Sequence, residues 1–196
     1  MSHLLSSLRV ALATMLVCVL GYTLLILSFA QAVTPATAQG SLIEGPDGSI
    51  IGSRLIAQGF TQAHYLWPRP SAVDYNAAGA GGSNLSPANP ALAERAEGLI
   101  AAHGSVSETN PIPADLVTAS GAGLDPHISL DGALFQAERV AAARGVEVGR
   151  VRDLIGRLAA EPGGPFTSDP IVNVLEVNLA LDAEIPHDAA SDGSLD

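Results

Sequence analysis

The sequence predicts an α+β protein, with a single N-terminal transmembrane helix followed by one soluble α+β domain. An uncharged apolar run covers Val10–Ala30 of the 196-residue chain. Beyond this run, stretches with helical spacing and a stretch with strand-like alternation lie between segments rich in Gly and Pro. About 150 residues remain once the run and its flank are removed, which is the size of one ordinary domain.

The run Val10–Ala30 is long enough to cross a bilayer, because about 20 residues of helix span a hydrocarbon core roughly 30 Å thick. A cleaved signal peptide is the alternative. Arg9 would supply its basic start, and Ala30–Ala32 and Ala36–Ala38 have the A-x-A pattern of cleavage sites. The run exceeds the apolar core of a typical signal peptide, about 7–15 residues, so we favour the uncleaved anchor.

The charges that flank the run predict its orientation. Arg9 precedes it, and no Lys or Arg follows until Arg54. The positive-inside rule then places residues 1–9 in the cytoplasm and the body outside. We expect an extended linker over residues 31–40. The soluble domain covers 41–185, and a polar tail, 186–196, is predicted to be disordered.

Small residues mark one side of the predicted membrane helix. They recur at spacings of three, four, three and seven, and they are Ala11, Thr14, Cys18, Gly21 and Ser28. Small residues at helical spacing let a second helix approach closely, so we interpret this stripe as a candidate partner-docking face. The alternative is that such residues are simply common in membrane helices.

The soluble body is acidic and contains no cysteine. Its 20 acidic residues and the eight arginines beyond Arg9 give it a net charge of −12, and the chain has no lysine. This charge argues against nucleic acid and against anionic lipid surfaces as partners of the body. Because Cys18 lies in the membrane run, the body has no disulfide framework and no thiolate metal site.

The first elements expected after the linker are a hairpin and a short helix. The hairpin pairs Ser41–Ile43 with Ile50–Ile51 across a turn rich in Gly and Pro. Ser53 is expected to cap a helix over Arg54–Gly59, with Leu55 directed inward.

A long irregular segment, His64–Pro87, follows and contains the only Trp and two of the three Tyr residues. A loop of this length inside a compact domain is usually functional or a packed Ω-like segment. Arg69 lies between two prolines on a stiff backbone. That position suits either an ion pair within the chain or a contact with a partner, and both interpretations stay open.

Three helices and a strand are expected in the remainder. The first helix begins at the Asn89–Pro90 cap and ends at Gly104, and the others cover residues 131–143 and 148–160. Residues 171–181 are predicted to form a strand, because apolar and polar side chains alternate. Its apolar face would hold Leu175, Val177, Leu179 and Leu181, and its polar face Glu176, Asn178 and Asp182.

The residues carry no recognisable catalytic or metal-binding motif. Gly79–Ser83 is glycine-rich, but no Gly-Lys-Ser/Thr follows, which excludes a P-loop. Ser120, Asp125 and His127 are the residue types of a hydrolase, yet no serine lies in a G-x-S-x-G elbow. We expect Asp125–Ser129 to organise the start of a helix instead. The five histidines include no H-x-x-x-H pair, so we predict no zinc site.

Short motifs follow one another in a specific order along nearly the whole chain. They are Gly52–Gln58, Arg69–Ala72, Gly82–Leu85, Asn89–Pro90, Asp115–Gly121, Gly123–Ser129, Arg139–Ala141, Arg144–Gly145 and Val172–Asp182. Together with the N-terminal span, they resemble the C subunit of the bacterial Kdp potassium-transporting P-type ATPase. The departures are small: Ala57 and Ser86 stand where glycine is expected, and Ala122 replaces a more usual serine.

The resemblance implies a non-catalytic subunit of a complex that hydrolyses ATP to drive potassium uptake across the inner membrane. Its implied partners are a channel-like potassium-translocating subunit and a P-type ATPase subunit, within membrane lipid and without nucleic acid. The implied role is assembly, together with a role as a catalytic chaperone that raises the ATP affinity of the ATPase subunit. No cofactor is assigned to this chain, and ATP is reached only through the complex. The candidate functional loop comprises Arg69, Pro70, Ser71, Ser83, Asn84, Asp125 and His127.

These implied roles differ in what they demand of the body. A body outside the membrane cannot touch cytoplasmic ATP, so an effect on ATP affinity would be coupled through the span and the partner subunits. Alternatively, the acidic body forms an external cap that concentrates or filters potassium over the pore. A purely structural clamp is a further alternative. The remote one is a secreted hydrolase, released by cleavage near Ala38.

Overall fold

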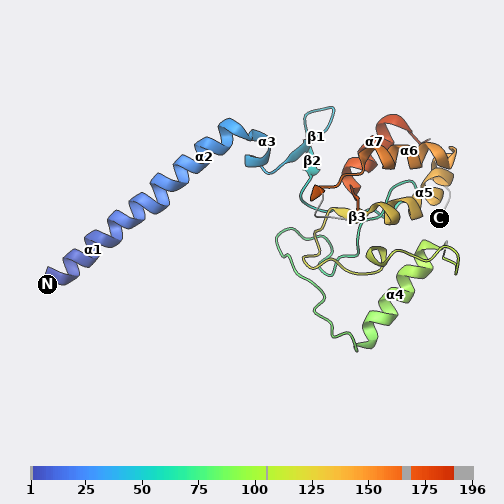
Figure 1. The fold of residues 1–196 in the computed structure, drawn as a ribbon, viewed down its shortest axis with the longest axis horizontal. Helices are drawn as coiled ribbons and strands as arrows, with labels where there is room; N and C mark the ends of the chain where they lie inside the picture. Colours follow the sequence, from blue (N-terminus) through green and yellow to red (C-terminus); the bar gives the residue numbers. More distant parts are fainter. Residues whose placement is uncertain (1, 105, 165–168, 188–196) are drawn as a thin grey trace. The chain divides into compact units, whose positions relative to one another are not determined.

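The computed structural model describes residues 2–104, 106–164 and 169–187. The chain divides between Ser53 and Arg54 into two compact units. The first unit holds the long N-terminal helix and a hairpin, and the second holds the remaining helices and a two-stranded sheet (Figure 1). The predicted fold class, one N-terminal apolar helix followed by an α+β domain, is therefore confirmed. The predicted tail lies outside the described residues from 188 onward.

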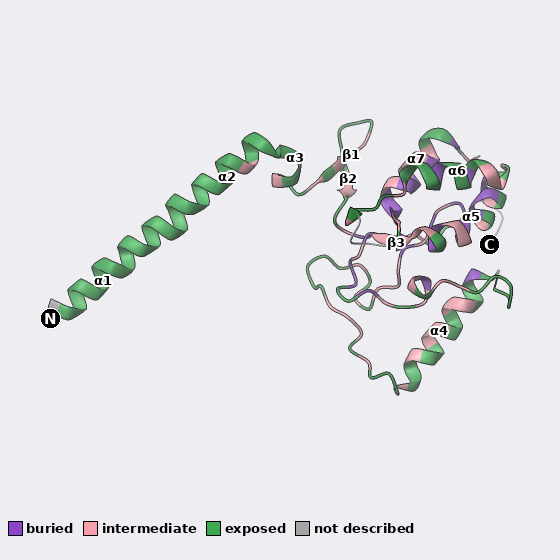
Figure 2. Cartoon of the chain, in the orientation of Figure 1, coloured by how far each residue is buried: buried purple, intermediate pink, exposed green. Residues whose placement is uncertain are grey.

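The N-terminal helix extends beyond the predicted span at both ends. It consists of α1 (Ser2–Met15), a π-helical turn (Leu16–Gly21) and α2 (Tyr22–Val33). Its apolar stretch, His3–Val33, has 31 residues, and its most apolar part is not buried by the rest of the chain (Figure 2). A helix of that length exceeds a hydrocarbon core of roughly 30 Å, so it is compatible with a single-pass membrane anchor.

The residues after this helix are not extended as expected. Pro35–Ala38 form the short helix α3, because Pro35 occupies the first helical position, where its missing N–H costs no hydrogen bond. The predicted hairpin is confirmed, since β1 (Leu42–Glu44) pairs antiparallel with β2 (Ile50–Ser53). In its turn, the Asp47 carboxylate accepts hydrogen bonds from the hydroxyl and N–H of Ser49, which lower the pKa of Asp47.

The predicted helix over Arg54–Gly59 is wrong. Ser53 belongs to β2, and its hydroxyl donates to the Gly40 carbonyl instead of capping a helix. The backbone that follows is bonded to distant segments. The Arg54 carbonyl accepts from the Asn173 side chain at 2.9 Å, and the Ala57 N–H donates to the Leu124 carbonyl at 3.0 Å. These long-range bonds take the groups that a local helix would have paired.

Two strand–helix arms form the centre of the second unit. In one arm, β3 (His127–Ser129) leads directly into α5 (Leu130–Arg144). In the other, β4 (Ile171–Asn173) leads into α7 (Val174–Glu184). The two strands pair antiparallel, with Ile128 opposite Val172. Both helices therefore start from the same small sheet.

Each arm begins with the same short pattern, Asp-Pro followed by a strand that ends in a capping residue. Asp125–Ser129 reads Asp-Pro-His-Ile-Ser, and Asp169–Asn173 reads Asp-Pro-Ile-Val-Asn. The Ser129 hydroxyl accepts the N–H of Gly132, and the Asn173 side chain caps α7 in the same way. The expectation that Asp125–Ser129 organises the start of a helix is confirmed.

The predicted strand over residues 171–181 is wrong beyond its first three residues. Asn173 ends β4 and caps α7, so the chain turns helical at Val174. The buried residues of α7 are Val174, Leu175, Val177, Asn178 and Leu181. That set has the spacing of one helix face, and the alternation of apolar residues coincided with part of it. Asn178, which we expected on an exposed face, is only 2% exposed.

The hydrophobic core gathers on α5, α6 (Val148–Leu158) and α7, where Figure 2 shows most of the buried residues. α6 packs on α5 and on α7. The large buried side chains include Leu66, Leu116, Ile128, Val140, Val151, Leu154, Ile155, Val172, Val177 and Leu181. Leu66 and Leu116 come from irregular segments, so the core depends on loops as well as on the helices.

The helix α4 (Pro90–His103) lies between long connecting segments (Figure 1). It starts and ends as predicted: the Asn89 side chain accepts the Ala91 N–H, and Gly104 adopts a left-handed conformation. Its apolar residues are only half-buried, and His103 is the one buried residue of this helix. α4 is therefore attached to the rest of the unit mainly through its C-terminal end.

Candidate functional site

Most of the predicted loop residues meet where two irregular segments pack against each other, residues 69–84 and 120–127. The Ser71 hydroxyl donates to the Gly123 carbonyl at 2.8 Å. The N–H of Ser120 donates to the Pro70 carbonyl at 3.1 Å. Reciprocal bonds of this kind fix the two segments to each other without regular secondary structure.

Two glycines explain why these segments are glycine-rich. Gly123 has a φ of +68°, and a Cβ atom there would lie 2.6 Å from a methyl carbon of Val73. A Cβ atom at Gly82 would lie 2.7 Å from the Gly121 carbonyl oxygen. Both positions require glycine because the backbones approach so closely. Here the glycine-rich stretches serve packing between loops.

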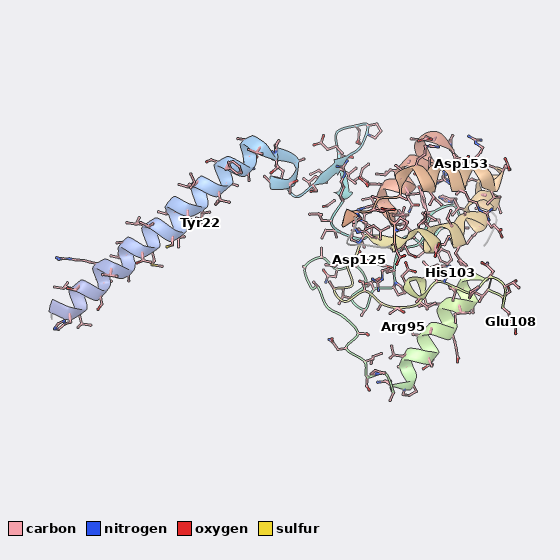
Figure 3. All side chains as sticks on the ribbon, viewed as in Figure 1. Tyr22, Arg95, His103, Glu108, Asp125 and Asp153 are labelled. Carbon is pink, nitrogen blue, oxygen red and sulfur yellow. The ribbon has the colours of Figure 1, made fainter. Side chains whose placement is uncertain are left out.

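Arg69, Asp125 and His127 form a small polar group at this contact. The Arg69 guanidinium lies 3.1 Å from one oxygen of Asp125, which precedes β3 (Figure 3). The other oxygen accepts the backbone N–H of His127 at 3.0 Å and lies 3.5 Å from its Nδ1. Hydrogen bonding from the His127 side chain, and then the neighbouring Arg69, lower the pKa of Asp125. The structure thus places Arg69 in an ion pair within the chain.

Ser83 and Asn84 are the remaining two residues of the candidate functional loop. They follow Gly82 on the way to α4, and Asn84 adopts a φ of +49°, which asparagine tolerates better than most residues. Within the part of the chain that the structure describes, neither side chain hydrogen-bonds to Arg69 or Asp125. The structure therefore joins five of the seven predicted loop residues: Arg69, Pro70, Ser71, Asp125 and His127.

The arrangement offers a His–Asp pair but no nucleophile. Among the described residues, no serine or threonine hydroxyl hydrogen-bonds to His127, and Ser120 is buried with 3% exposure. Over the same described ranges, no group of three His, Cys, Asp or Glu side chains could hold a metal ion. An ion pair and backbone hydrogen bonds can fix two loops, and we assign no reaction to this group.

A second cluster was missed by the sequence analysis. In it, side-chain amides of α5 and α7 bind the backbone of residues 63–67. Asn178 accepts the N–H of Leu66 at 2.8 Å and donates to its carbonyl at 3.0 Å. Gln136 does the same for Trp67, at 2.8 and 3.1 Å. The amides take the place of a neighbouring strand, so this segment can be buried without belonging to a sheet.

Two arginines of α5 complete this cluster. Arg144, whose side chain is 0% exposed, contacts Asp182 at 2.8 Å and donates to the carbonyls of His64, Leu181 and Ile185. Arg139 donates to two backbone carbonyls of the segment and lies over the Trp67 ring at 3.9 Å. Burial lowers the pKa of Arg139 to about 10. The sequence did contain a usable signal for this cluster, since some of its polar residues lie on the inward face of the helix predicted over residues 131–143.

The small-residue stripe lies on a helix that is not a uniform α-helix. Cys18 and Gly21 belong to the π-helical turn, which contains more residues than an α-helical turn. The regular α-helical spacing used to predict the stripe therefore does not apply across this turn. The Thr14 hydroxyl donates to the Val10 carbonyl at 2.8 Å, within the same helix. Docking of a partner on this stripe stays a prediction.

Comparison with known proteins identifies the family. The family described as "KdpC: K+-transporting ATPase, c chain" matches residues 4–183. The chain belongs to the KdpC family. The potassium-transporting ATPase KdpC subunit of Parvibaculum lavamentivorans is 54% identical over 182 residues, 93% of this chain and 97% of that protein. The KdpC subunit of Pectobacterium atrosepticum is 47% identical over 191 residues, 95% of this chain and 99% of that protein.

The family motifs coincide with contacts inside this KdpC-family chain. Ser71 and Gly123, from two motifs, bond to each other and join the two loops. Arg144 and Asn178, from two others, hold the backbone of residues 63–67. The resemblance found from the sequence is confirmed, and its motif residues prove to support the architecture of the second unit.

Proposed function

We propose that this KdpC-family chain is a non-catalytic accessory subunit that aids assembly of a potassium-transporting ATPase. One observation carries the proposal: the apolar helix over His3–Val33 has its most apolar stretch entirely unburied by its own chain. Its surface is thus available for lipid and for the helices of partner subunits. The names of its relatives, potassium-transporting ATPase KdpC subunits, support the same role.

The proposal includes an orientation and partners. Residues 1–9 are cytoplasmic, the helix spans the inner membrane, and the body is periplasmic, because Arg9 is the basic residue that flanks the span. The partners are the channel-like subunit and the P-type ATPase subunit. Protease treatment of spheroplasts should digest the body, and protection of the body would contradict this orientation. N-terminal sequencing checks the anchor, since a mature start at Gln39 would mean cleavage.

A rise in the ATP affinity of the ATPase subunit is part of the proposed role, and no ATP site is assigned to this chain. With a periplasmic body, the effect has to pass through the membrane helix as a difference in affinity between conformations of the complex. The π-helical turn Leu16–Gly21 is an irregular element at the right depth for such coupling, because π-helical turns often occur at functional sites. The helix therefore serves both docking and coupling in this proposal.

The stripe can be tested by Gly21→Leu in the assembled complex. A Cβ atom at Gly21 would lie 3.7 Å from the Leu16 carbonyl oxygen, an ordinary contact, so the helix itself tolerates the change. Loss of close helix packing should weaken association by about 1–2 kcal/mol, roughly five- to thirtyfold. The readouts are co-purification of the partner subunits and potassium-stimulated ATPase activity.

The matched control for this test is Ala13→Leu, which adds similar bulk to the same helix at a small residue outside the stripe. If both variants lose partners equally, the loss comes from bulk in general and the stripe has no special part. If neither variant loses partners, the stripe is not a docking face.

A second candidate function, an external cap that enriches potassium, is favoured by exposed acidic residues on the body. Glu94 and Glu97 are exposed on α4, and Glu108 is exposed beyond it. Replacing these three by Gln should weaken the apparent potassium affinity of the complex at low ionic strength, and added salt should remove the difference. Glu138→Gln is the control, because Glu138 is already paired with Arg152. An unchanged affinity at low salt would contradict the cap.

A further inference from the structure

A cavity of about 290 Å³ lies between α4 and the irregular segments that precede it. Its walls are mainly apolar and aromatic, and they include Phe60, Trp67, Tyr75, Leu99, His103 and Leu116. These residues belong to the second unit, and no role assigned above to the membrane helix or to the Arg69–Asp125 pair involves this space. The cavity lies where α4 is attached to the domain, through His103.

The size of the cavity suits one substituted aromatic ring. An apolar cavity of about 150 Å³ is enough to hold benzene in a protein core. The rings of Trp67 and His103 are 5.1 Å apart and tilted by 49°, and Phe135 meets His103 edge to face at 6.0 Å. Aromatic walls at such angles attract a further ring, because the edge of one ring complements the face of another.

His103 gives the cavity a polar anchor. It is 7% exposed, and no described residue hydrogen-bonds to its ring nitrogens. Figure 3 shows His103 at the end of α4. Its ring meets that of Phe135 of α5 edge to face. Burial, and then the charge of Arg139, lower the pKa of His103 to about 4, so the imidazole is neutral near pH 7. A neutral imidazole has one donor and one acceptor, so it can form a hydrogen bond with a polar group of a ligand in the cavity.

The charges around the cavity favour a neutral ligand. No carboxylate or lysine is among the residues that line it. Arg139, which lies against the Trp67 ring, is engaged by the carbonyls of Ala63 and Tyr65. A charged ligand would therefore lose its hydration without gaining a counter-charge. A ligand with one polar group would instead satisfy His103 and place the rest of its surface on apolar walls.

We propose that this cavity is a binding site for a small neutral aromatic molecule that carries one hydrogen-bonding group, as phenol does. The ring packs among Trp67, Tyr75 and Leu99, and the polar group bonds to His103. α4 forms one wall, and the cavity is partly open to solvent, which gives the ligand a way in. The proposal is independent of the role of the chain in the ATPase.

Trp67 makes the site directly observable, because it is the only tryptophan of the chain and lines the cavity. The experiment titrates the full chain in nanodiscs with phenol and follows Trp67 emission, excited at wavelengths that phenol does not absorb. We expect a saturable change. Toluene has nearly the same shape without the hydroxyl. After each affinity is corrected for the transfer of the ligand from water to hydrocarbon, toluene should bind about three- to tenfold more weakly, the worth of one hydrogen bond. A change linear in phenol concentration, or equal corrected affinities for phenol and toluene, would overturn the proposal.

Three variants on α4 test whether the change in Trp67 emission comes from binding in the cavity. Leu99→Phe narrows the cavity and should weaken saturable binding, whereas Leu92→Phe, on the same helix but outside the cavity, should leave it unchanged. His103→Phe should remove the preference for phenol over toluene. It also serves as the second test if Leu99→Phe does not fold. An unchanged affinity for phenol in Leu99→Phe, or a preference for phenol that survives His103→Phe, would contradict the assignment.

Discussion

Asn178→Ala should strongly destabilise the second unit. The Asn178 side chain is 2% exposed and makes two hydrogen bonds, of 2.8 and 3.0 Å, to the backbone of Leu66, which is 0% exposed. Truncation leaves one buried donor and one buried acceptor without partners, at about 1–3 kcal/mol each. We therefore expect a loss of about 2–6 kcal/mol in the free energy of unfolding. A domain is held by only about 5–15 kcal/mol, so the effect should be large.

The assay is urea unfolding of the full chain in detergent, followed by the emission of Trp67, the neighbour of Leu66. Asn76→Ala is the matched control, since Asn76 is exposed and its side chain accepts the Ala78 N–H in a turn. That control should change the free energy of unfolding by about 0.5 kcal/mol or less. If Asn178→Ala costs no more than Asn76→Ala, then the Leu66 backbone finds other partners, and the reasoning about amide-held segments is refuted.

Two further changes probe the packed loops in the same unfolding assay. Gly123→Ala should lower the free energy of unfolding by about 2–4 kcal/mol, because its Cβ would lie 2.6 Å from Val73 and its φ is +68°. The control is Gly104→Ala, which has a φ of +69° and open space around it and should lower the free energy of unfolding by only about 1–2 kcal/mol. Equal losses in the two variants would contradict the loop contact. For Asp125, folding lowers the pKa from 3.8, chiefly through His127. The contribution of the Asp125 carboxylate to stability is present above pH 3.8 and is lost as the pH falls through the lower folded pKa. The free energies of unfolding of wild type and Asp125→Asn should therefore converge in acid. A difference between them that does not depend on pH would contradict this linkage.

The features that the sequence predicted well are those decided by neighbouring residues. Asn89 and Ser129 cap helices, and Gly104 and Gly145 end them, because capping depends on a side chain or a backbone angle within a few residues. The hairpin was predictable for the same reason, since the composition of its turn is sufficient. Local chemistry thus gave most of the element boundaries.

The errors and omissions involve partners far along the chain. The helix expected at Arg54–Gly59 fails because Asn173 and Leu124 take its backbone groups. The sequence does not indicate which group the side-chain amide of Asn178 binds, because that backbone lies 112 residues earlier. One usable signal was overlooked. The Asp-Pro pattern at 125 recurs at 169 and marks Asn173 as a cap, which would have turned the predicted strand into a helix.

The candidate site was only partly visible from the sequence, for the same reason. The candidate functional loop included Arg69, Ser71 and Asp125, but the spacing of these residues could not show that they bond across two loops. The pairing depends on the close approach at Gly123, which is a tertiary contact.

The amide-held segment also has a consequence for the time course of biosynthesis. The ribosome makes Leu66 and Trp67 long before Gln136 and Asn178, which follow their targets by 69 and 112 residues. Until α7 emerges, the N–H and carbonyl groups of Leu66 lack their partner Asn178, so this part of the segment stays solvated and open to proteases and chaperones. Closing loops of that length is slow. A chain that stops short of Asn178 would thus carry a complete N-terminal helix and an unfinished second unit, a state that quality control can recognise before assembly.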